Sequence, residues 1–190
     1  MIAALYVDVG NGPYPQLPGV DCWGLARDAT AYAGPWPVVA HPPCGHWGRL
    51  SHFCKDDGHT GPIAVAQVRR WGGVLEHPAD SQLWRKCSMP APGWLPDEWG
   101  GYTVAVNQCD WGHRAAKATW LYVVGCPVDR LPAVPPPVDR SGLLVVTNEQ
   151  RKGDPGYRAR LPGRERHLTP PAFADWLVAV ARQCVRADGQ

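Results

Sequence analysis

The chain contains a series of short apolar segments, several of which end in polar residues, separated by glycine- and proline-rich stretches. Short apolar runs bounded by turn residues are typical of buried strands. Between them, residues 61–71 and 170–186 carry apolar side chains at helical spacing and predict two helices. This alternation predicts an α/β domain with a Rossmann-like, mostly parallel sheet and flanking helices. The expected strands cover residues 2–9, 37–40, 73–78, 102–106 and 120–125.

Length and composition fit one loop-rich domain over residues 1–190. This length is enough for one hydrophobic core and short for two. Ten tryptophans indicate an ordered core despite 21 glycines and 21 prolines, because disordered segments are poor in aromatic residues. We expect a core sheet over 1–130, including a short helix within 21–32, and a proline-rich and basic loop region over 131–168. A C-terminal helix over 169–186 is expected to pack back on the core.

Charge and cysteine usage narrow the class of protein. The formal net charge of +2 permits nucleic-acid binding through a local basic patch without requiring it. The seven cysteines form no C-x-x-C pair, so neither a disulfide scaffold nor a zinc ribbon is indicated. The first residues lack the basic region of a signal peptide, and no apolar run approaches the length of a membrane span. A cytoplasmic protein without membrane contact is therefore expected.

Polar groups follow three of the expected strands. They are Asp8, the His-Pro-Pro-Cys turn that ends at Cys44, and Glu76. Sites in parallel sheets lie beyond the carboxyl ends of the strands, so these groups are expected to converge on one crevice. The prolines fix the backbone before Cys44, which suits a nucleophile, and burial is expected to raise the pKa of Glu76 so that it shares a proton. The alternatives are an inert buried thiol and a solvated turn carboxylate.

Four segments, in this order, resemble DNA cytosine-5 methyltransferases. That family has a Pro-Pro-Cys nucleophile turn, then a helix, then a strand ending in Glu-Asn, matched here by PVVAHPPCGHWGRLS and GGVLEHP. VNQCDWGHRAAKATWLYVVG resembles the family's next element, with Asn107, Trp111, Gly112, Lys117 and Gly125 at the matching places. LTPPAFADWL resembles the terminal helix that folds back to the cofactor pocket in phage-type members.

The resemblance implies a function for three residues. Cys44 would attack carbon 6 of a cytosine that is flipped out of DNA, and Glu76 would hydrogen-bond ring nitrogen 3 and the amino group. Lys117 matches the first arginine of the family's basic pair and would hold a phosphate or brace the loop. S-adenosylmethionine would donate the methyl group to carbon 5.

The cofactor side of the resemblance departs from the family pattern. The glycine-rich Phe-x-Gly-x-Gly loop is absent, and VDVGNGPYP aligns best with the family's second strand, so that the chain would begin one strand late. Asp8 would then bind the cofactor ribose, and Asp28 would contact the adenine. Pro42 and Pro43 are the other expected cofactor contacts. The short recognition region suggests a phage or mobile-element origin, and a homodimer or a partner chain would supply missing parts.

Two other functions stay open. A catalytically inactive methyltransferase-like DNA-binding protein would grip phosphates through a basic run, although this run can also be a solvated loop. The run comprises Arg151, Lys152, Arg158, Arg160, Arg164 and Arg166. A Cys/His metal site is the second alternative, because six ligand-type residues crowd one stretch in a spacing that matches no standard zinc signature. These residues are His41, Cys44, His46, His52, Cys54 and His59.

Overall fold

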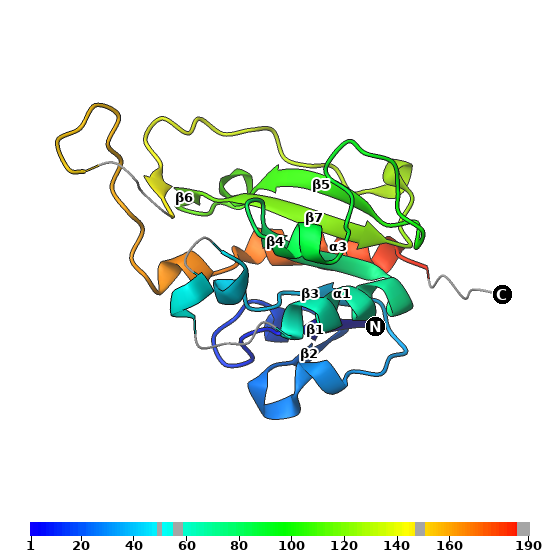
Figure 1. Ribbon diagram of the computed structural model, residues 1–190. Coiled ribbons are helices and arrows are strands. Elements are labelled where there is room, and N and C mark those ends of the chain that lie inside the picture. Colours follow the sequence, from blue (N-terminus) through cyan, green and yellow to red (C-terminus); the bar gives the residue numbers. More distant parts are fainter. Residues whose placement is uncertain (49–50, 55–58, 147–150, 186–190) are drawn as a thin grey trace.

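The computed structural model describes residues 1–48, 51–54, 59–146 and 151–185. Within these residues a six-stranded sheet has the order β2-β1-β3-β4-β7-β5, and a separate two-stranded sheet pairs β6 with β8 (Figure 1). The strands are β1 (Ile2–Leu5), β2 (Val20–Trp23), β3 (Val38–Ala40), β4 (Gly73–Pro78), β5 (Tyr102–Asn107), β6 (Ala115–Ala116), β7 (Ala118–Val124) and β8 (Leu144–Val145).

Helices cover both faces of the large sheet. The α-helices are α1 (Thr60–Trp71), α2 (Leu83–Lys86) and α3 (Pro171–Gln183). Short 3-10 turns fill the connections: η1 (Tyr14–Gln16), η2 (Leu25–Arg27), η3 (Ala29–Ala31), η4 (Gly45–Trp47), η5 (Ser51–Phe53), η6 (Gln108–Trp111), η7 (Val128–Arg130) and η8 (Glu165–His167). None of the helices in the described ranges has both the length and the apolarity that crossing a bilayer requires.

The sheet is mixed, so the expectation of a mostly parallel sheet is confirmed in part. β2, β1, β3 and β4 pair in parallel, whereas β7 runs antiparallel to both β4 and β5. A parallel return needs a crossover of a dozen or more residues, usually a helix. The connection over 108–117 holds only the η6 turn and the two-residue β6, so the chain doubles back beside β5.

Residues 21–32, where one short helix is expected, contain the two 3-10 helices η2 and η3, preceded by the edge strand β2. Its four residues are only half-buried, and they include the carboxylate of Asp21, so no apolar run marks them as a strand. β2 pairs with β1 alone and is followed by the two turns η2 and η3. Pairing along the sheet edge therefore decides a conformation that the local pattern leaves ambiguous.

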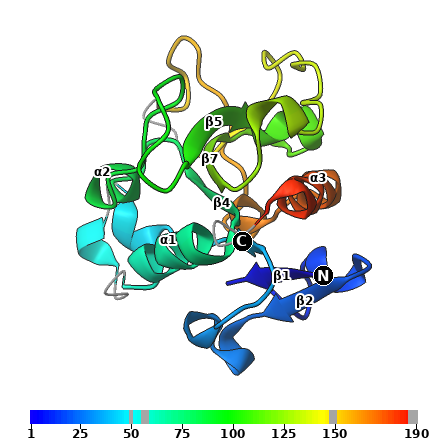
Figure 2. The same ribbon diagram turned by 90° about the vertical axis from the view of Figure 1, so that its right-hand side faces the viewer.

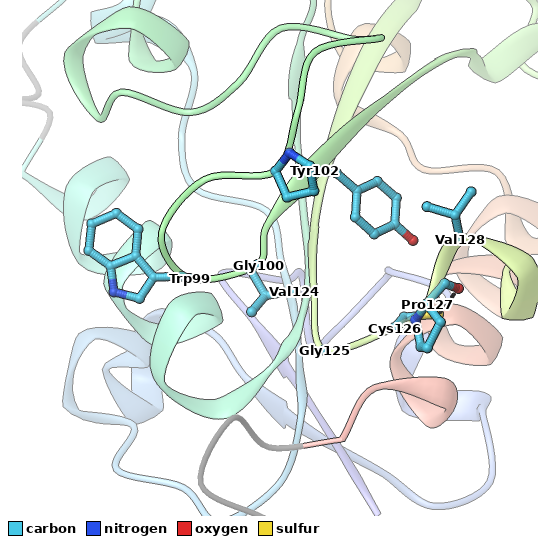
Figure 3. Close-up of a pocket in the computed structure, with 9 residues that line it drawn as sticks. Trp99, Gly100, Tyr102, Val124, Gly125, Cys126, Pro127 and Val128 are labelled. Carbon is cyan, nitrogen blue, oxygen red and sulfur yellow. Dashed lines mark hydrogen bonds between the residues drawn. The ribbon is translucent and has the colours of Figure 1, made fainter.

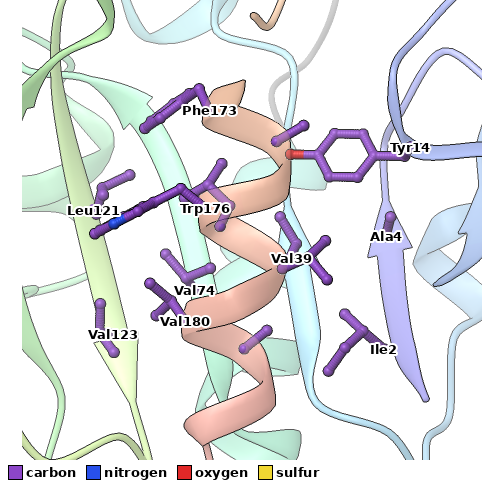
Figure 4. Close-up of a cluster of buried hydrophobic side chains, with 14 of the residues drawn as sticks. Ile2, Ala4, Tyr14, Val39, Val74, Leu121, Val123, Phe173, Trp176 and Val180 are labelled. Carbon is purple, nitrogen blue, oxygen red and sulfur yellow. The ribbon is translucent and has the colours of Figure 1, made fainter. Parts of the chain in front are cut away.

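Two apolar clusters hold the layers together. On one face, α1 packs Ala64, Val65 and Val68 against a cluster that includes Leu75 and Tyr122 of the sheet. On the other face, α3 packs an aromatic and aliphatic stripe against β1, β3, β4 and β7, as Figure 4 shows. The view along the sheet in Figure 2 has α1 and α3 on opposite sides of it. The labelled members of the α3 cluster are Ile2, Ala4, Tyr14, Val39, Val74, Leu121, Val123, Phe173, Trp176 and Val180.

The alternation of side chains along a strand determines which face of the sheet each residue near the carboxyl edge occupies. Val74 belongs to the α3 cluster and Leu75 to the α1 cluster. Because successive side chains point to opposite faces, Glu76 lies on the α3 face and His77 on the α1 face. The same alternation in β3 directs the side chain of His41 to the α3 face, beside Glu76.

The strand order reverses between β1 and β3. From β1 the chain moves outward to β2 and then returns to place β3 on the other side of β1. In doubly wound sheets such a switch point opens a crevice at the carboxyl ends of the strands, where ligands bind. The residues at this crevice are the turn that begins at Asp8 and the His41–Cys44 turn.

The described residues of 144–168 pack against the end of the molecule that holds this crevice. β8 pairs in parallel with β6, Val145 bridges to Arg160, and Leu161 is fully buried. An ion pair between Arg114 and Glu165 joins η8 to the segment before β6. In Figure 1 the amber and orange stretch of this region lies at the end that also holds the cyan η4 and η5 turns.

Candidate active site

The three residues assigned catalytic functions lie near one another at the carboxyl edge of the sheet. Cys44 follows β3 and precedes η4, Glu76 lies in β4, and Lys117 joins β6 to β7. The charges of Glu76 and Lys117 both act on the Cys44 thiol, and Lys117 also acts on Glu76. Parallel strands β3 and β4 are adjacent, so their carboxyl ends bring the thiol and the carboxylate to one edge.

Glu76 is a buried carboxylate that stays ionised. Its Oε2 accepts a hydrogen bond from Nδ1 of His41 at 3.0 Å, and its Oε1 accepts one from Nε2 of Gln108 at 2.8 Å. Burial alone would raise the pKa of Glu76, but the His41 hydrogen bond and the positive charge of Lys117 outweigh it and lower the pKa to about 2. The expectation of a raised pKa is therefore wrong, and Glu76 acts as an acceptor at neutral pH.

Tyr14 completes the polar environment on the other side of His41. Its hydroxyl lies 2.5 Å from Nε2 of His41, and its ring is buried. Burial and the negative charge of Glu76 raise the pKa of Tyr14 well above its ordinary value, so the phenol keeps its proton. His41 is thereby held between a phenol and a carboxylate.

Gln108 extends the hydrogen bonds toward β7. Its Nε2 also donates to Oγ1 of Thr119 at 3.1 Å, and that hydroxyl donates to the carbonyl of Lys117 at 3.2 Å. Gln108 is fully buried, and its Oε1 has no hydrogen-bond partner in the described ranges. We call the five hydrogen-bonded residues Tyr14, His41, Glu76, Gln108 and Thr119 the edge network.

Cys44 carries a half-buried thiol that is protonated at rest. Burial and the negative charge of Glu76 raise the pKa of Cys44, and the positive charge of Lys117 only partly offsets them. A second thiol lies close by, because a Cβ on Gly45 would come within 2.9 Å of the Cys54 sulfur. Cys44 therefore needs a proton acceptor, or a substrate that takes the proton, before it can act as a nucleophile.

His77 lies directly after Glu76 but faces α1. It is fully buried, and its ring packs edge-on to Trp84 at a centroid distance of 6.3 Å. Burial lowers the pKa of His77 to about 4, against the opposing effects of the Glu76 charge and the Pro43 carbonyl. Neither ring nitrogen forms a hydrogen bond of ordinary geometry within the described residues, so His77 packs as a neutral ring.

Asp8 forms a tight turn at the carboxyl end of β1. Its Oδ1 accepts from the backbone nitrogens of Gly10 and Asn11 at 2.9 and 3.1 Å. A Cβ on Gly12 would lie 2.4 Å from the Asp8 carbonyl, so the turn closes only over glycine. In the common doubly wound order, the first strand lies between the second and fourth. β1 lies between β2 and β3, and the same order remains when the first strand of that arrangement is missing, so the alignment of β1 with the second strand stays a prediction.

The other expected cofactor contacts differ in their surroundings. Asp28 is exposed in the left-handed conformation and caps η3 by accepting from the backbone nitrogen of Thr30. It lies close enough to Tyr6, at the end of β1, for its charge to reinforce the burial that raises the pKa of that tyrosine. Pro42 is buried and Pro43 is exposed, so only Pro43 presents its ring to solvent at the crevice.

The metal alternative finds no geometric support in the described ranges. No group of three or more histidine, cysteine, aspartate or glutamate side chains gathers there in an arrangement that would hold a metal ion. His52 is exposed and its ring is tilted against that of Phe53 with centroids 4.1 Å apart, and the ring of His46 packs edge-on to Trp47.

A separate apolar pocket of about 400 Å³ lies at the other end of the strands, near the start of β4 (Figure 3). It is lined by Trp99, Tyr102 and Val128, together with residues 124–127 at the end of β7. Val124 pairs with Gly73 at the start of β4, so the pocket lies away from the carboxyl end that holds Glu76. It contains none of the residues expected to bind cofactor or substrate.

Sequence reasoning singled out Cys44 and Glu76, which the structure brings to one edge of the sheet, but it missed most of the edge network. His41 was noted as a metal-ligand type, while Tyr14 and Gln108 were not singled out. Gln108 directly follows β5, so the rule that polar residues at strand ends mark a site would have identified it. No such signal exists for Tyr14, which reaches His41 from a loop turn.

In comparisons with known proteins, no family model, no curated protein and no solved structure matches the chain. The strand order, the edge network and the thiol beside it are therefore the observations from which a function is inferred.

Proposed function

We propose that the protein is a divergent DNA cytosine-5 methyltransferase-like enzyme, in which Cys44 attacks a flipped cytosine and S-adenosylmethionine is the methyl donor. One observation carries the proposal: an ionised, buried carboxylate, Glu76, lies at the carboxyl edge of an α/β sheet, close enough to Cys44 for its charge to raise the pKa of that thiol. A thiol and a carboxylate at one edge can hold the same planar ring, the first by bonding to carbon and the second by hydrogen bonds.

The hydrogen-bond capacity of Glu76 favours cytosine as the ring. Each carboxylate oxygen holds one donor, from His41 or Gln108, and keeps lone pairs for a further donor. A cytosine protonated at ring nitrogen 3 offers two neighbouring donors, N3–H and an amino N–H. Uracil offers a carbonyl oxygen in place of the amino group, and an acceptor facing a carboxylate is unfavourable.

The thiol chemistry balances with the groups at hand. As the bond from the Cys44 sulfur to C6 forms, the C5=C6 electrons shift through C4 toward N3, which takes the thiol proton against the Glu76 carboxylate. The positive charge of Lys117 lowers the pKa of Cys44 and eases this ionisation. Once carbon 5 has received the methyl group, a solvent water would take the C5 proton, the C5=C6 bond would re-form, the sulfur would leave as a thiolate, and the N3 proton would return to it.

The Asp8 turn suits the binding of a nucleoside cofactor. It lies at the carboxyl end of β1, beside the switch point, where such sheets bind ligands. The exposed carboxylate of Asp8 keeps acceptor capacity for ribose hydroxyls after it accepts from Gly10 and Asn11. S-adenosylmethionine bound there would supply the methyl group to carbon 5.

The experiment that tests the proposal traps the protein on DNA that contains 5-fluorocytosine, in the presence of S-adenosylmethionine. We expect a covalent adduct with the wild-type chain and none with Cys44→Ser. Cys54→Ser is the matched control, since it removes a neighbouring thiol outside the proposed machinery and should leave the adduct. Absence of an adduct in the wild-type chain, together with no calorimetric heat from S-adenosylmethionine, would sink the enzymatic proposal.

The raised pKa of Cys44 favours the protonated thiol, which is a poor nucleophile, and so supports a second function, that of an inactive DNA-binding relative. The basic residues Arg151, Lys152, Arg160 and Arg164 are exposed at the end of the molecule that holds the site (Figure 1). DNA binding that weakens steeply with salt, shows no cytosine preference and gives no adduct would favour this function over methyl transfer.

A further inference from the structure

His41 stands between Tyr14 and Glu76 with both ring nitrogens engaged. Nδ1 contacts Glu76 at 3.0 Å and Nε2 contacts Tyr14 at 2.5 Å. The His41 and Glu76 side chains are only 12% and 10% exposed, so water has little access to compete for these contacts. Such a contact in a largely water-excluded setting is stronger than one on the surface.

The ionised carboxylate of Glu76 determines the direction of the hydrogen bonds that it makes. An ionised carboxylate only accepts, so Nδ1 of His41 must carry the hydrogen. Nε2 of His41 shares the other hydrogen bond with the hydroxyl of Tyr14, which keeps its proton and can donate to it. The Gln108 amide likewise turns its NH₂ group toward Glu76. The donors from both sides therefore converge on Glu76.

Charged and titratable groups face Glu76 from each neighbouring strand end. His41 approaches from β3, His77 follows in β4, Lys117 lies before β7, and Tyr14 and Cys44 lie in the adjoining turns. His77 is a neutral ring on the opposite face of β4. Lys117 acts through its charge, while His41 is the titratable group with a hydrogen bond to the carboxylate.

We infer that His41, braced by Tyr14, is a positioning residue that holds Glu76 as an acceptor-only carboxylate, and that it thereby sets the selection of cytosine over uracil. The selectivity part of this inference rests on the proposed function. Burial without the His41 donor favours the protonated form of Glu76. A protonated carboxyl group offers an O–H donor, which pairs with the ring carbonyl that uracil presents.

The direct test measures the titration of the Glu76 carboxyl group by ¹³C NMR on the full chain without DNA, with Glu76→Gln used for assignment. We expect His41→Leu to move the titration upward by about one pH unit or more, a tenfold change in proton affinity. His41→Asn keeps an N–H donor near the position of Nδ1 and should restore most of the wild-type behaviour. Equal titration in wild type and His41→Leu, or equal shifts in His41→Leu and His41→Asn, would overturn the inference.

Tyr14→Phe provides a milder variant, should His41→Leu fail to fold. Without the phenol, the His41 ring can adopt the other tautomer, in which Nδ1 accepts and no longer donates to Glu76. We expect the Glu76 titration to move upward, by less than with His41→Leu. An unchanged titration would remove Tyr14 from the inference.

The selectivity test compares adduct yields on DNA that contains either 5-fluorocytosine or 5-fluorouracil. We expect the preference of the wild-type chain for 5-fluorocytosine to fall about tenfold in His41→Leu and to persist in His41→Asn. An unchanged preference in His41→Leu would overturn the selectivity part. If no protein forms an adduct, the proposed function fails, whereas the NMR titration still decides whether His41 controls Glu76.

Discussion

Two neighbouring residues of β4, Glu76 and His77, differ in charge state because they lie on opposite faces of the sheet. Glu76 gains a donor on each oxygen and keeps its charge, whereas His77, on the other face, loses its charge to burial. Strand alternation accounts for this difference, because one side chain meets the polar edge network and the next meets tryptophan rings. A single residue of register thus separates a polar site from packed core.

The depressed pKa of Glu76 predicts a loss of stability in acid. The folded pKa is about 2 and the ordinary value is 4.5, so the unfolded chain binds more protons between these values. The contribution of Glu76 is therefore present above about pH 4.5 and disappears as the pH falls toward 2. We expect the stability advantage of wild type over Glu76→Gln to shrink by about 3 kcal/mol across this window in urea unfolding. An advantage that stays constant with pH would contradict this reading.

The partners of Glu76 explain why its position was predictable and its pKa was not. Strand-end logic identifies a carboxylate in the crevice from residues 73–78 alone. The main groups that lower its pKa come from His41, which lies 35 residues away in the sequence, and from Lys117, which lies beyond β5. The apolar residues around Glu76 in the sequence predict its burial, which raises its pKa. They do not reveal the distant partners that lower the pKa instead.

At the scale of elements, apolar runs and helical spacing predicted the positions of five strands and of the helices α1 and α3. These signals work because each element buries a face whose period is visible locally. The direction of β7 leaves no such mark, since a buried strand looks alike in parallel and antiparallel pairing. β2 was missed because a half-buried edge strand lacks the apolar run.

The junction between α1 and β4 depends on glycine at position 73. Gly73 has a φ of +126°, and a Cβ there would lie 2.0 Å from the Val38 carbonyl in the neighbouring strand. We expect Gly73→Ala to destabilise the protein by about 3 kcal/mol or more, through strain and separation of β3 from β4. Gly93→Ala is the control, since Gly93 also has a positive φ but would have no atom within 4 Å of a new Cβ.

Thermal or urea unfolding of the two alanine variants measures this difference. The control should lose about 1 kcal/mol from its backbone conformation alone. Equal losses in both variants would mean that the contact with Val38 contributes nothing to the junction.

At the scale of the whole molecule, the two ends differ in character. One end carries the edge network, Cys44 and the exposed cations of residues 151–166, while the other carries the apolar pocket beside η7. In Figure 1 the amber region and the cyan turns share the first end. DNA bound through the cations would therefore lie next to the proposed nucleophile.

This arrangement predicts a measurable salt dependence. If Arg160 and Arg164 each neutralise a phosphate, replacing both with alanine should reduce the slope of log K against log salt by about 2. Arg130→Ala, in η7 at the opposite end, is the matched control and should leave the slope unchanged. Fluorescence anisotropy with a short duplex at several salt concentrations measures both. A slope that changes equally in all variants would contradict a localised DNA surface.

The place of β7 between β4 and β5 has a consequence for biosynthesis. β4 and β5 leave the ribosome before residues 118–124, and each must keep a row of backbone groups unpaired until that strand arrives between them. Open strand edges of this kind invite pairing with other chains. A nascent chain that stalls before Ala118 therefore exposes two open strand edges and is prone to aggregate. Rapid synthesis of residues 118–124 shortens the time for which these edges stay open.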